Sequence, residues 1–273
     1  MKFSNKFTKY TIEKIGLVFF IYFMVCLGFV NILKAQSPSI NDSNVVEDNK
    51  LIADSQKKNI SDSDRKEDAI IVIGASFVEA WPIQEIGGVR TINKGVAGEQ
   101  SFEMLQRFEK DVLSLNPRAV IIWGFMNDIH RTLRKNIDAA MLKARESIEE
   151  MVLLAKRNGI EPILVTEVTI RGKDDLRNVL AGWIGRIRGK ASYQDYVNGH
   201  VLDMNQWIRK YAEENDIVLF DFQPLIADEK GFRKKEFANE DGIHISPAAY
   251  EQLTAYAKAK FNASRTNNRV VVE

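Results

Sequence analysis

The sequence has little of what several protein classes depend on. Its 273 residues include one cysteine, Cys26, which lies in an apolar run near the N-terminus. The rest of the chain therefore has no thiol, no disulfide and no cysteine-based metal site. The formal net charge is only +1, and no basic run is interleaved with aromatic residues, which argues against nucleic acid as a partner. Histidine is also scarce, with three in the chain, and no internal repeat is visible.

The first 35 residues form a targeting segment rather than part of a folded core. Residues 15–33 carry no charge and are preceded by four lysines. Lysines before an apolar run hold the N-terminus in the cytoplasm, so we expect the rest of the chain to be exported. Two outcomes stay open. Bulky Leu33 makes residues 33–35 a poor cleavage site, which favours a retained membrane anchor facing the periplasm or cell surface, whereas cleavage would release the protein.

The remaining chain divides into a linker, one domain and a tail. Residues 36–68 are polar, with too few large apolar residues to bury a face, and predict a flexible linker. Residues 69–262 alternate short apolar runs with amphipathic stretches, a pattern typical of a parallel sheet covered by helices. Residues 263–273 lack a pattern and are expected to fray. The five expected strands are 70–73, 91–93, 119–123, 163–168 and 217–222.

Five strands with helices between them predict a three-layer α/β/α domain. The clearest helix is 138–157, which Asp138 can cap. Its apolar face consists of Met141, Ala144, Ile148, Met151 and Ala155. The last helix begins at Ser246 and Pro247, an N-cap residue followed by the residue best tolerated at the first helical position. Ligands of such sheets bind at the carboxyl ends of the strands, so the site is sought there.

A serine follows the first expected strand at such an end. Ser76 comes directly after Gly74 and Ala75, so the chain can turn sharply and present the hydroxyl at the start of a helix, near backbone N–H groups. Two interpretations stay open at this point: a helix N-cap and a nucleophile. A nucleophilic serine needs a base within hydrogen-bond reach and a third group that orients the base.

His244 and Asp241 meet that requirement by their spacing. A carboxylate three residues before an imidazole, with a glycine between them, can fold back on one ring nitrogen and leave the other facing a serine. A solvent-exposed loop pair is the alternative. Acyl transfer also needs donors to an oxyanion. After the second strand, Gly95 and Gly98 can bring backbone N–H groups close to a ligand, and after the third, Asn127 offers an amide, although these residue types are common in plain turns.

The order of these residues resembles the SGNH hydrolases, also called GDSL esterases or lipases, whose four sequence blocks each supply one site residue. The matching positions are Ser76, Gly98, Asn127 and His244. The block DGIHISPAAY is the most specific. The resemblance implies a flavodoxin-like sheet of five parallel strands and hydrolysis of esters or thioesters without a metal or cofactor. It also implies a triad completed by Asp241 and an oxyanion hole formed by Ser76, Gly98 and Asn127.

Two positions depart from the family pattern. Ala75 stands where the family usually has an aspartate before the nucleophile, so any polar contact from that aspartate is absent. Two residues separate Gly124 from Asn127 where one is usual, so we base the match of this block on Asn127. Two further side chains just beyond it, Asp128 and His130, are expected to line the substrate site.

The segment 171–198 does not fit the alternating pattern. It places six apolar residues, Trp183 among them, on one helical face and surrounds that face with arginine and lysine. Three interpretations stay open: a helix packed on the domain, a lid that places Trp183 against the substrate, and a helix that lies on an anionic membrane or polymer.

These observations together predict an exported serine esterase. By analogy with exported relatives, the expected substrates are short acyl groups, above all O-acetyl, on carbohydrate or on small lipid-like esters. Two alternatives stay open. An O-acyltransferase would use the same triad on an envelope polysaccharide, and a binding protein on a degenerate fold would have no activity.

Overall fold

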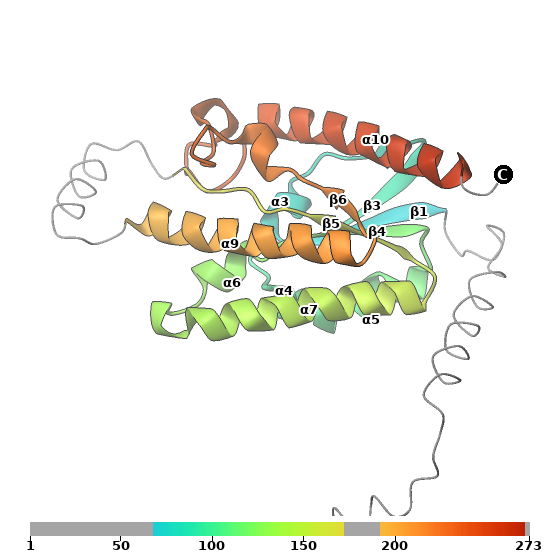
Figure 1. Ribbon diagram of the computed structural model, residues 1–273, viewed down its shortest axis with the longest axis horizontal. Coiled ribbons are helices and arrows are strands. Elements are labelled where there is room, and N and C mark those ends of the chain that lie inside the picture. Colours follow the sequence, from blue (N-terminus) through green and yellow to red (C-terminus); the bar gives the residue numbers. More distant parts are fainter. Residues whose placement is uncertain (1–67, 172–191, 271–273) are drawn as a thin grey trace, which may run out of the picture. The chain divides into compact units, whose positions relative to one another are not determined.

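The computed structural model describes residues 68–171 and 192–270, in which a six-stranded sheet lies between layers of helices (Figure 1). The strand order is β2-β3-β1-β4-β5-β6, and all neighbours pair in parallel except β2 and β3. The predicted α/β fold with a largely parallel sheet is confirmed. The strands are β1 (Ala69–Gly74), β2 (Glu85–Ile86), β3 (Val89–Gly95), β4 (Ala119–Trp123), β5 (Glu161–Val165) and β6 (Val218–Phe220).

The sixth strand, β2, is one more than the sequence predicts. It is two residues long and pairs antiparallel with β3 at the edge of the sheet. Gly87 and Gly88 form the turn between them, with φ values of 58° and 77°. A two-residue turn with positive φ at both positions matches the twist of a hairpin and favours glycine. A strand of two residues is too short to show the alternation by which strands are recognised.

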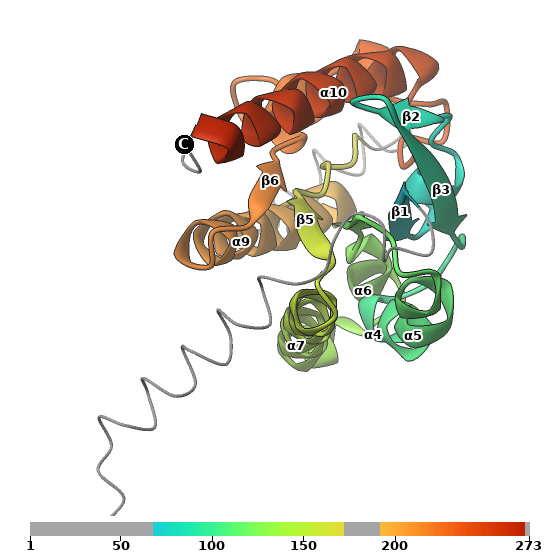
Figure 2. The ribbon, with the colours of Figure 1, turned by 90° about the vertical axis from the view of Figure 1, so that its right-hand side faces the viewer.

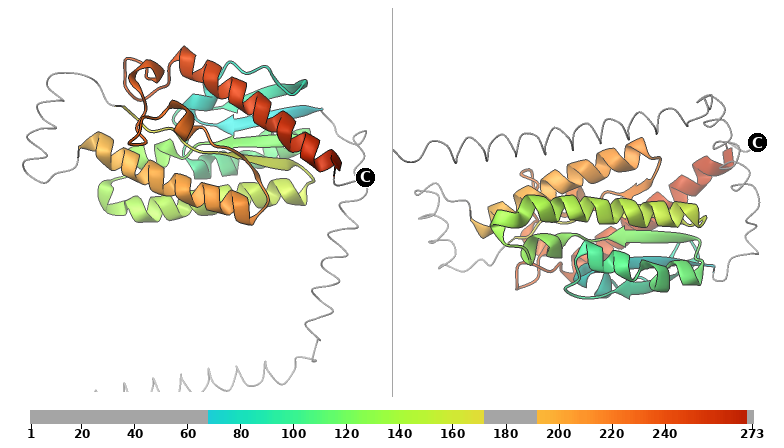
Figure 3. Two further views of the ribbon diagram at one scale, coloured as in Figure 1. Left: turned by 45° about the horizontal axis from the view of Figure 1, so that its top comes forward. Right: turned by 90° about the horizontal axis from the view of Figure 1, so that it is seen from below.

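Helices cover both faces of the sheet, as the view along it shows (Figure 2). On one face, α3 packs against β1 and β3, and α10 packs against β2 and β6. The other face is covered by α4 and α5, which follow β3 in the chain, and α4 packs against β1. On the same face, α7 and α9 lie side by side (Figure 3). The helices are α3 (Ser76–Glu79), α4 (Ser101–Gln106), α5 (Phe108–Asp111), α6 (Met126–His130), α7 (Ile137–Arg157), α9 (Tyr193–Glu214) and α10 (Pro247–Val270).

The predicted helix at 138–157 is confirmed as α7, and its five predicted core residues are all buried. One detail was wrong: Asn136 is the N-cap, and Asp138 lies inside the first turn. An acidic side chain there still favours the positive end of the helix dipole. The last helix begins at Pro247 as predicted, and the hydroxyl of Ser246 accepts a hydrogen bond of 3.4 Å from the N–H of Ala249.

The helix α10 also continues to Val270, through most of the segment expected to be a frayed tail. In the part of the chain that the structure describes, no helix is both long enough and apolar enough to cross a membrane. The expected targeting segment, the linker and residues 172–191 lie outside the described residues.

The register of the central strands brings three strand ends together. Gly74, the last residue of β1, lies beside Gly95 of β3 and Trp123 of β4. All residues of β1 and β4 are buried, because apolar side chains on both faces pack under helices. The loops that follow these three strands, and with them the predicted site residues, therefore leave the sheet at one edge.

Candidate active site

Ser76 is the first residue of α3, immediately past the end of β1. An added Cβ at Gly74 would lie 2.2 Å from the carbonyl oxygen of Trp123, so only glycine lets the chain turn there. Ala75 is the N-cap residue of α3, and no side chain caps this helix. The interpretation of Ser76 as an N-cap was therefore wrong. Its hydroxyl instead lies 3.2 Å from Nε2 of His244.

The second ring nitrogen of His244 is held by Asp241. Nδ1 lies 2.5 Å from Oδ2 of Asp241, while Oδ1 accepts the backbone N–H groups of Ile243 and His244, each at 2.8 Å. Gly242, with φ of 73°, lets the chain fold back over this short distance. Burial alone would raise the pKa of Asp241, but the hydrogen bonds from His244 and Ile243 outweigh it and lower the pKa. The carboxylate is therefore the stable form beside the imidazole.

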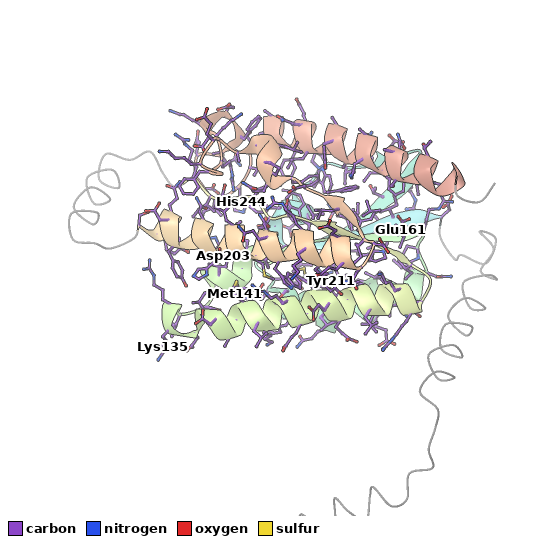
Figure 4. All side chains as sticks on the ribbon, viewed as in Figure 1. Lys135, Met141, Glu161, Asp203, Tyr211 and His244 are labelled. Atoms are coloured by element: carbon purple, nitrogen blue, oxygen red, sulfur yellow. The ribbon has the colours of Figure 1, made fainter. Side chains whose placement is uncertain are left out.

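The position of His244 in the fold agrees with the strand-end rule. Figure 4 places His244 and Glu161, the first residue of β5, toward opposite ends of the sheet. His244 thus lies at the end where the parallel strands finish. Its ring also meets Phe77 edge-on, with the ring centroids 6.0 Å apart, and Phe77 stacks on Trp123 at 5.7 Å. Buried aromatic rings therefore form the floor under the imidazole.

A buried arginine that sequence reasoning missed supports the loop of His244. Nη1 of Arg233 donates to the carbonyl oxygens of Ile243 and His244, at 2.8 and 2.7 Å. Arg233 is 1% exposed, and burial lowers its pKa to about 10, so the guanidinium stays charged at neutral pH. Sequence offers little signal for it, because an arginine followed by two lysines resembles a solvated basic loop.

The charge of Arg233 faces an equally buried carboxyl group, Glu167. Glu167 is 1% exposed, and its Oε1 accepts the indole N–H of Trp123 at 3.2 Å and the N–H of Val168 at 3.1 Å. Burial raises the pKa of Glu167 to about 7, against hydrogen bonds and the Arg233 charge, which lower it. Glu167 thus bonds the aromatic floor through Trp123, and the nearby charge of Arg233 lowers its pKa.

Gly98 lies in the loop after β3 and Asn127 in the short helix α6 after β4, and hydrogen bonds tie the two segments together. Nδ2 of Asn127 donates to the carbonyl oxygen of Glu99 at 2.9 Å, and Arg131 donates to the carbonyl oxygen of Gly98 at 2.9 Å. Arg107 connects the loop of Gly98 to β1, since it donates to the carboxylate of Glu99 at 2.8 Å and to the carbonyl oxygen of Gly74 at 3.3 Å. The φ of Gly98 is 83°, a value that favours glycine.

Asp128 was expected to line the substrate site, but its side chain is buried elsewhere. It is 1% exposed, and its carboxylate accepts the N–H and the hydroxyl of Ser101, at 2.9 and 2.8 Å. Asp128 therefore fixes α6 to the first residue of α4. Burial raises its pKa to about 6, against the Ser101 hydrogen bonds, which lower it. The prediction failed because α6 turns Asp128 inward, whereas sequence shows only an acid beside Asn127.

His130 does lie near His244, and Trp183 lies outside the described residues. Nδ1 of His130 is 2.5 Å from the hydroxyl of Tyr193 at the start of α9. Burial and, secondarily, the nearby charge of His244 lower the pKa of His130. In residues 68–171 and 192–270, no three His, Cys, Asp or Glu side chains converge in a way that could hold a metal ion.

Comparisons with known proteins agree with this geometry. The model of the GDSL-like lipase/acylhydrolase family matches residues 76–252. Among solved structures, a GDSL-like lipase from Bacteroides thetaiotaomicron has 22% identity and a TM-score of 0.56 over 78% of this chain and 97% of that one. An acetylxylan esterase from Geobacillus stearothermophilus has 18% identity and a TM-score of 0.55 over 71% and 93%. No protein with a curated description matches. At these identities, the likeness to solved structures concerns the fold.

Proposed function

Because the chain belongs to the GDSL-like lipase/acylhydrolase family of ester-hydrolysing enzymes, we propose that Ser76, His244 and Asp241 are its catalytic triad. The observation that carries this proposal is the unbroken chain from the Ser76 hydroxyl to Nε2 of His244, 3.2 Å, and from Nδ1 to Asp241, 2.5 Å. Nucleophile, base and orienting carboxylate are all within the reach that the chemistry requires.

Hydrolysis would proceed in two steps through an acyl-enzyme. The Ser76 oxygen attacks the ester carbonyl while Nε2 of His244 takes the hydroxyl proton, and Asp241 stabilises the imidazolium that forms. The imidazolium then gives this proton to the departing alkoxide, which leaves as the alcohol. In the second step His244 takes a proton from water, the resulting hydroxide attacks the acyl carbonyl, and the proton returns to the Ser76 oxygen.

The oxyanion of each tetrahedral intermediate would be bound by the backbone N–H groups of Ser76 and Gly98 and by the amide of Asn127. Nδ2 of Asn127 carries two hydrogens, and Glu99 accepts one of them. The second is free for an oxyanion. The bond to Glu99 also fixes the amide before substrate arrives, and a donor fixed in advance needs no reorganisation during the reaction.

The proposed substrates are short acyl esters, above all O-acetyl groups on carbohydrate or on small lipid-like alcohols. A structurally similar protein is an acetylxylan esterase, which supports this choice by analogy of fold. The N-terminal apolar segment supports an exported location, anchored at the outer face of the membrane or released after cleavage. An enzyme in this location would meet envelope glycans, lipids and external esters.

A serine-directed fluorophosphonate probe tests the proposal. It should label the full-length protein, and Ser76→Ala should remove the label and reduce acetyl-ester hydrolysis by at least about 10⁴-fold. Ser114→Ala, which removes a hydroxyl remote from the triad that bonds Lys110, should retain both. Equal labelling of the Ser76 variant would reject the assignment. With an isotope-labelled acetyl donor and a glycan present, label in free acetate supports hydrolysis, and label on the glycan supports acyl transfer.

A further inference from the structure

A groove of about 730 Å³ begins at His244 and runs between α10 and the residues that follow α3. Its volume lies within the range of small-molecule sites, about 300–1,000 Å³. Ile245 is on its floor, Ala80 and Pro82 form one wall, and Glu251 and Ala255 lie on the other. Of the residues proposed for catalysis, His244 lines it, whereas Ser76, Asp241, Gly98 and Asn127 do not.

The mechanism determines which half of an ester this groove can take. The carbonyl oxygen must face the proposed oxyanion donors, Gly98 and Asn127, whereas the leaving oxygen must lie within reach of His244, which gives it a proton. A groove that includes His244 and excludes both oxyanion donors therefore lies on the leaving-group side. Its occupant is the alcohol half of the ester.

The side chains of the groove indicate what kind of alcohol fits. Lys258 at its far end is neutralised by Glu85, with Nζ and Oε1 2.7 Å apart. Among the described residues, no group forms an ion pair or hydrogen bond with the side chain of Glu251 or of Asn239. These two exposed groups can bind hydroxyls, and the one uncompensated charge, on Glu251, repels anions.

We propose that this groove is the subsite for the alcohol half of the substrate, and that it selects a neutral polyhydroxylated ring, such as a sugar residue, over an anionic alcohol. The apolar floor faces the carbon side of the ring, while Glu251 and Asn239 bind its hydroxyls. The inference rests on the proposed function, because it takes His244 as the group that protonates the leaving oxygen. Glu251 acts as a specificity residue and takes no part in the chemistry.

Substrates with one acyl group and different alcohols test this subsite, because all of them form the same acetyl-enzyme. In Ala255→Trp, the indole fills the groove from an exposed position on α10. We expect kcat/KM for an acetylated neutral methyl glycoside to fall about tenfold or more, with ethyl acetate within about twofold of wild type. Ala259→Trp, also exposed on α10 but outside the groove, should change neither value.

A second variant tests the charge. Glu251→Gln should raise kcat/KM for an acetylated uronate relative to the neutral glycoside by about three- to tenfold. Glu213→Gln, an exposed carboxylate on α9, should leave this ratio unchanged. Glycerol acetate is tested in the same variant. If Ala255→Trp lowered kcat/KM for glycerol acetate as much as for the glycoside, glycerol esters would be the source of the polyhydroxylated alcohol, and the preference for a ring would be overturned.

Failure of this inference differs from failure of the proposed function. An active wild type in which Ala255→Trp affects ethyl acetate and the glycoside equally, or affects neither, would overturn the subsite alone. An unchanged ratio in Glu251→Gln would overturn its charge selection. A folded wild type that hydrolyses no ester and reacts with no fluorophosphonate would overturn the proposed function, and the subsite with it.

Discussion

The loop that carries His244 and the loop that carries Gly98 are anchored by buried groups of opposite charge. Arg233 donates to two carbonyl oxygens of the first loop, whereas Asp128 accepts two hydrogen bonds from Ser101, just beyond the second. Burial leaves the pKa of Arg233 at about 10 but raises that of Asp128 to about 6. Arg233 therefore keeps its charge across the neutral pH range, whereas Asp128 titrates just below neutral pH.

The largest effect is expected at Arg233. Arg233→Met should lower the free energy of unfolding by about 3–5 kcal/mol, because it leaves the buried carbonyl oxygens of Ile243 and His244 without their donor. In the folded fraction, kcat should fall while KM changes little, since Arg233 positions His244 without touching the substrate. Urea unfolding and steady-state kinetics on the same preparations measure both quantities.

Two companion variants separate positioning from bulk stability. Arg233→Lys keeps a charged donor under the loop and should recover part of the lost kcat. Arg233→Met combined with Glu167→Gln also removes the buried carboxyl group whose pKa the Arg233 charge lowers. It should recover part of the stability without recovering kcat, because the loop carbonyls still lack a donor. If kcat returned together with stability in the double variant, Arg233 would have no positioning role.

At the other loop, Asn127→Ala should affect kcat more than the free energy of unfolding. If Asn127 is the oxyanion donor proposed above, its loss should raise the barrier by about 3 kcal/mol, or about 100-fold in kcat. Loss of the bond to Glu99 should lower stability by only about 1 kcal/mol. Asn136→Ala, at the N-cap of α7 where the side chain makes no cap hydrogen bond, is the control and should keep full activity. A wild-type rate in Asn127→Ala would remove this residue from the oxyanion hole.

The contrast between these two anchors also shows how far sequence reasoning reaches. That Ser76 and His244 lie together was predicted from local features, a strand end and a short Asp-Gly-Ile-His turn, and the structure places them 3.2 Å apart. Arg233 was missed because its partners are backbone carbonyls ten and eleven residues away, which no residue pattern encodes. Asp128 was misplaced because its direction depends on the packing of α6 against α4. Which polar side chain faces inward is a property of tertiary structure.

The same distinction applies to the fold. The central strands were predicted from buried, β-branched runs that parallel sheets require. The edge strand β2 and the last turns of α10 were missed because neither has a periodic apolar face of its own. Hydrophobic periodicity therefore predicted the buried central strands, whereas β2 and the last turns of α10 became visible only in the structure.

Asp128 should make stability depend on pH. Because burial raises its pKa from 3.8 to about 6, the folded state keeps this proton after the unfolded state has released it. The free energy of unfolding should therefore fall as pH rises from about 4 to about 6, by on the order of 3 kcal/mol, and level off above. Asp128→Asn cannot titrate, so the difference between wild type and variant isolates this contribution. If the free energies of unfolding of wild type and Asp128→Asn differed by the same amount at every pH from 4 to 7, the raised pKa would be contradicted.

The smallest expected effect compares two glycines. Gly98 and Gly88 have φ values of 83° and 77°, and an added Cβ would meet no atom within 4 Å at either. Alanine should therefore cost each about 1 kcal/mol of stability, through backbone strain alone. Only Gly98→Ala should also lower kcat, by about tenfold, because the strain shifts an N–H proposed to face the oxyanion. Gly88→Ala, in the β2–β3 turn, is the control, because Gly88 matches Gly98 in backbone conformation and in surrounding space. Equal kcat values in the two variants would show that the Gly98 N–H is not an oxyanion donor.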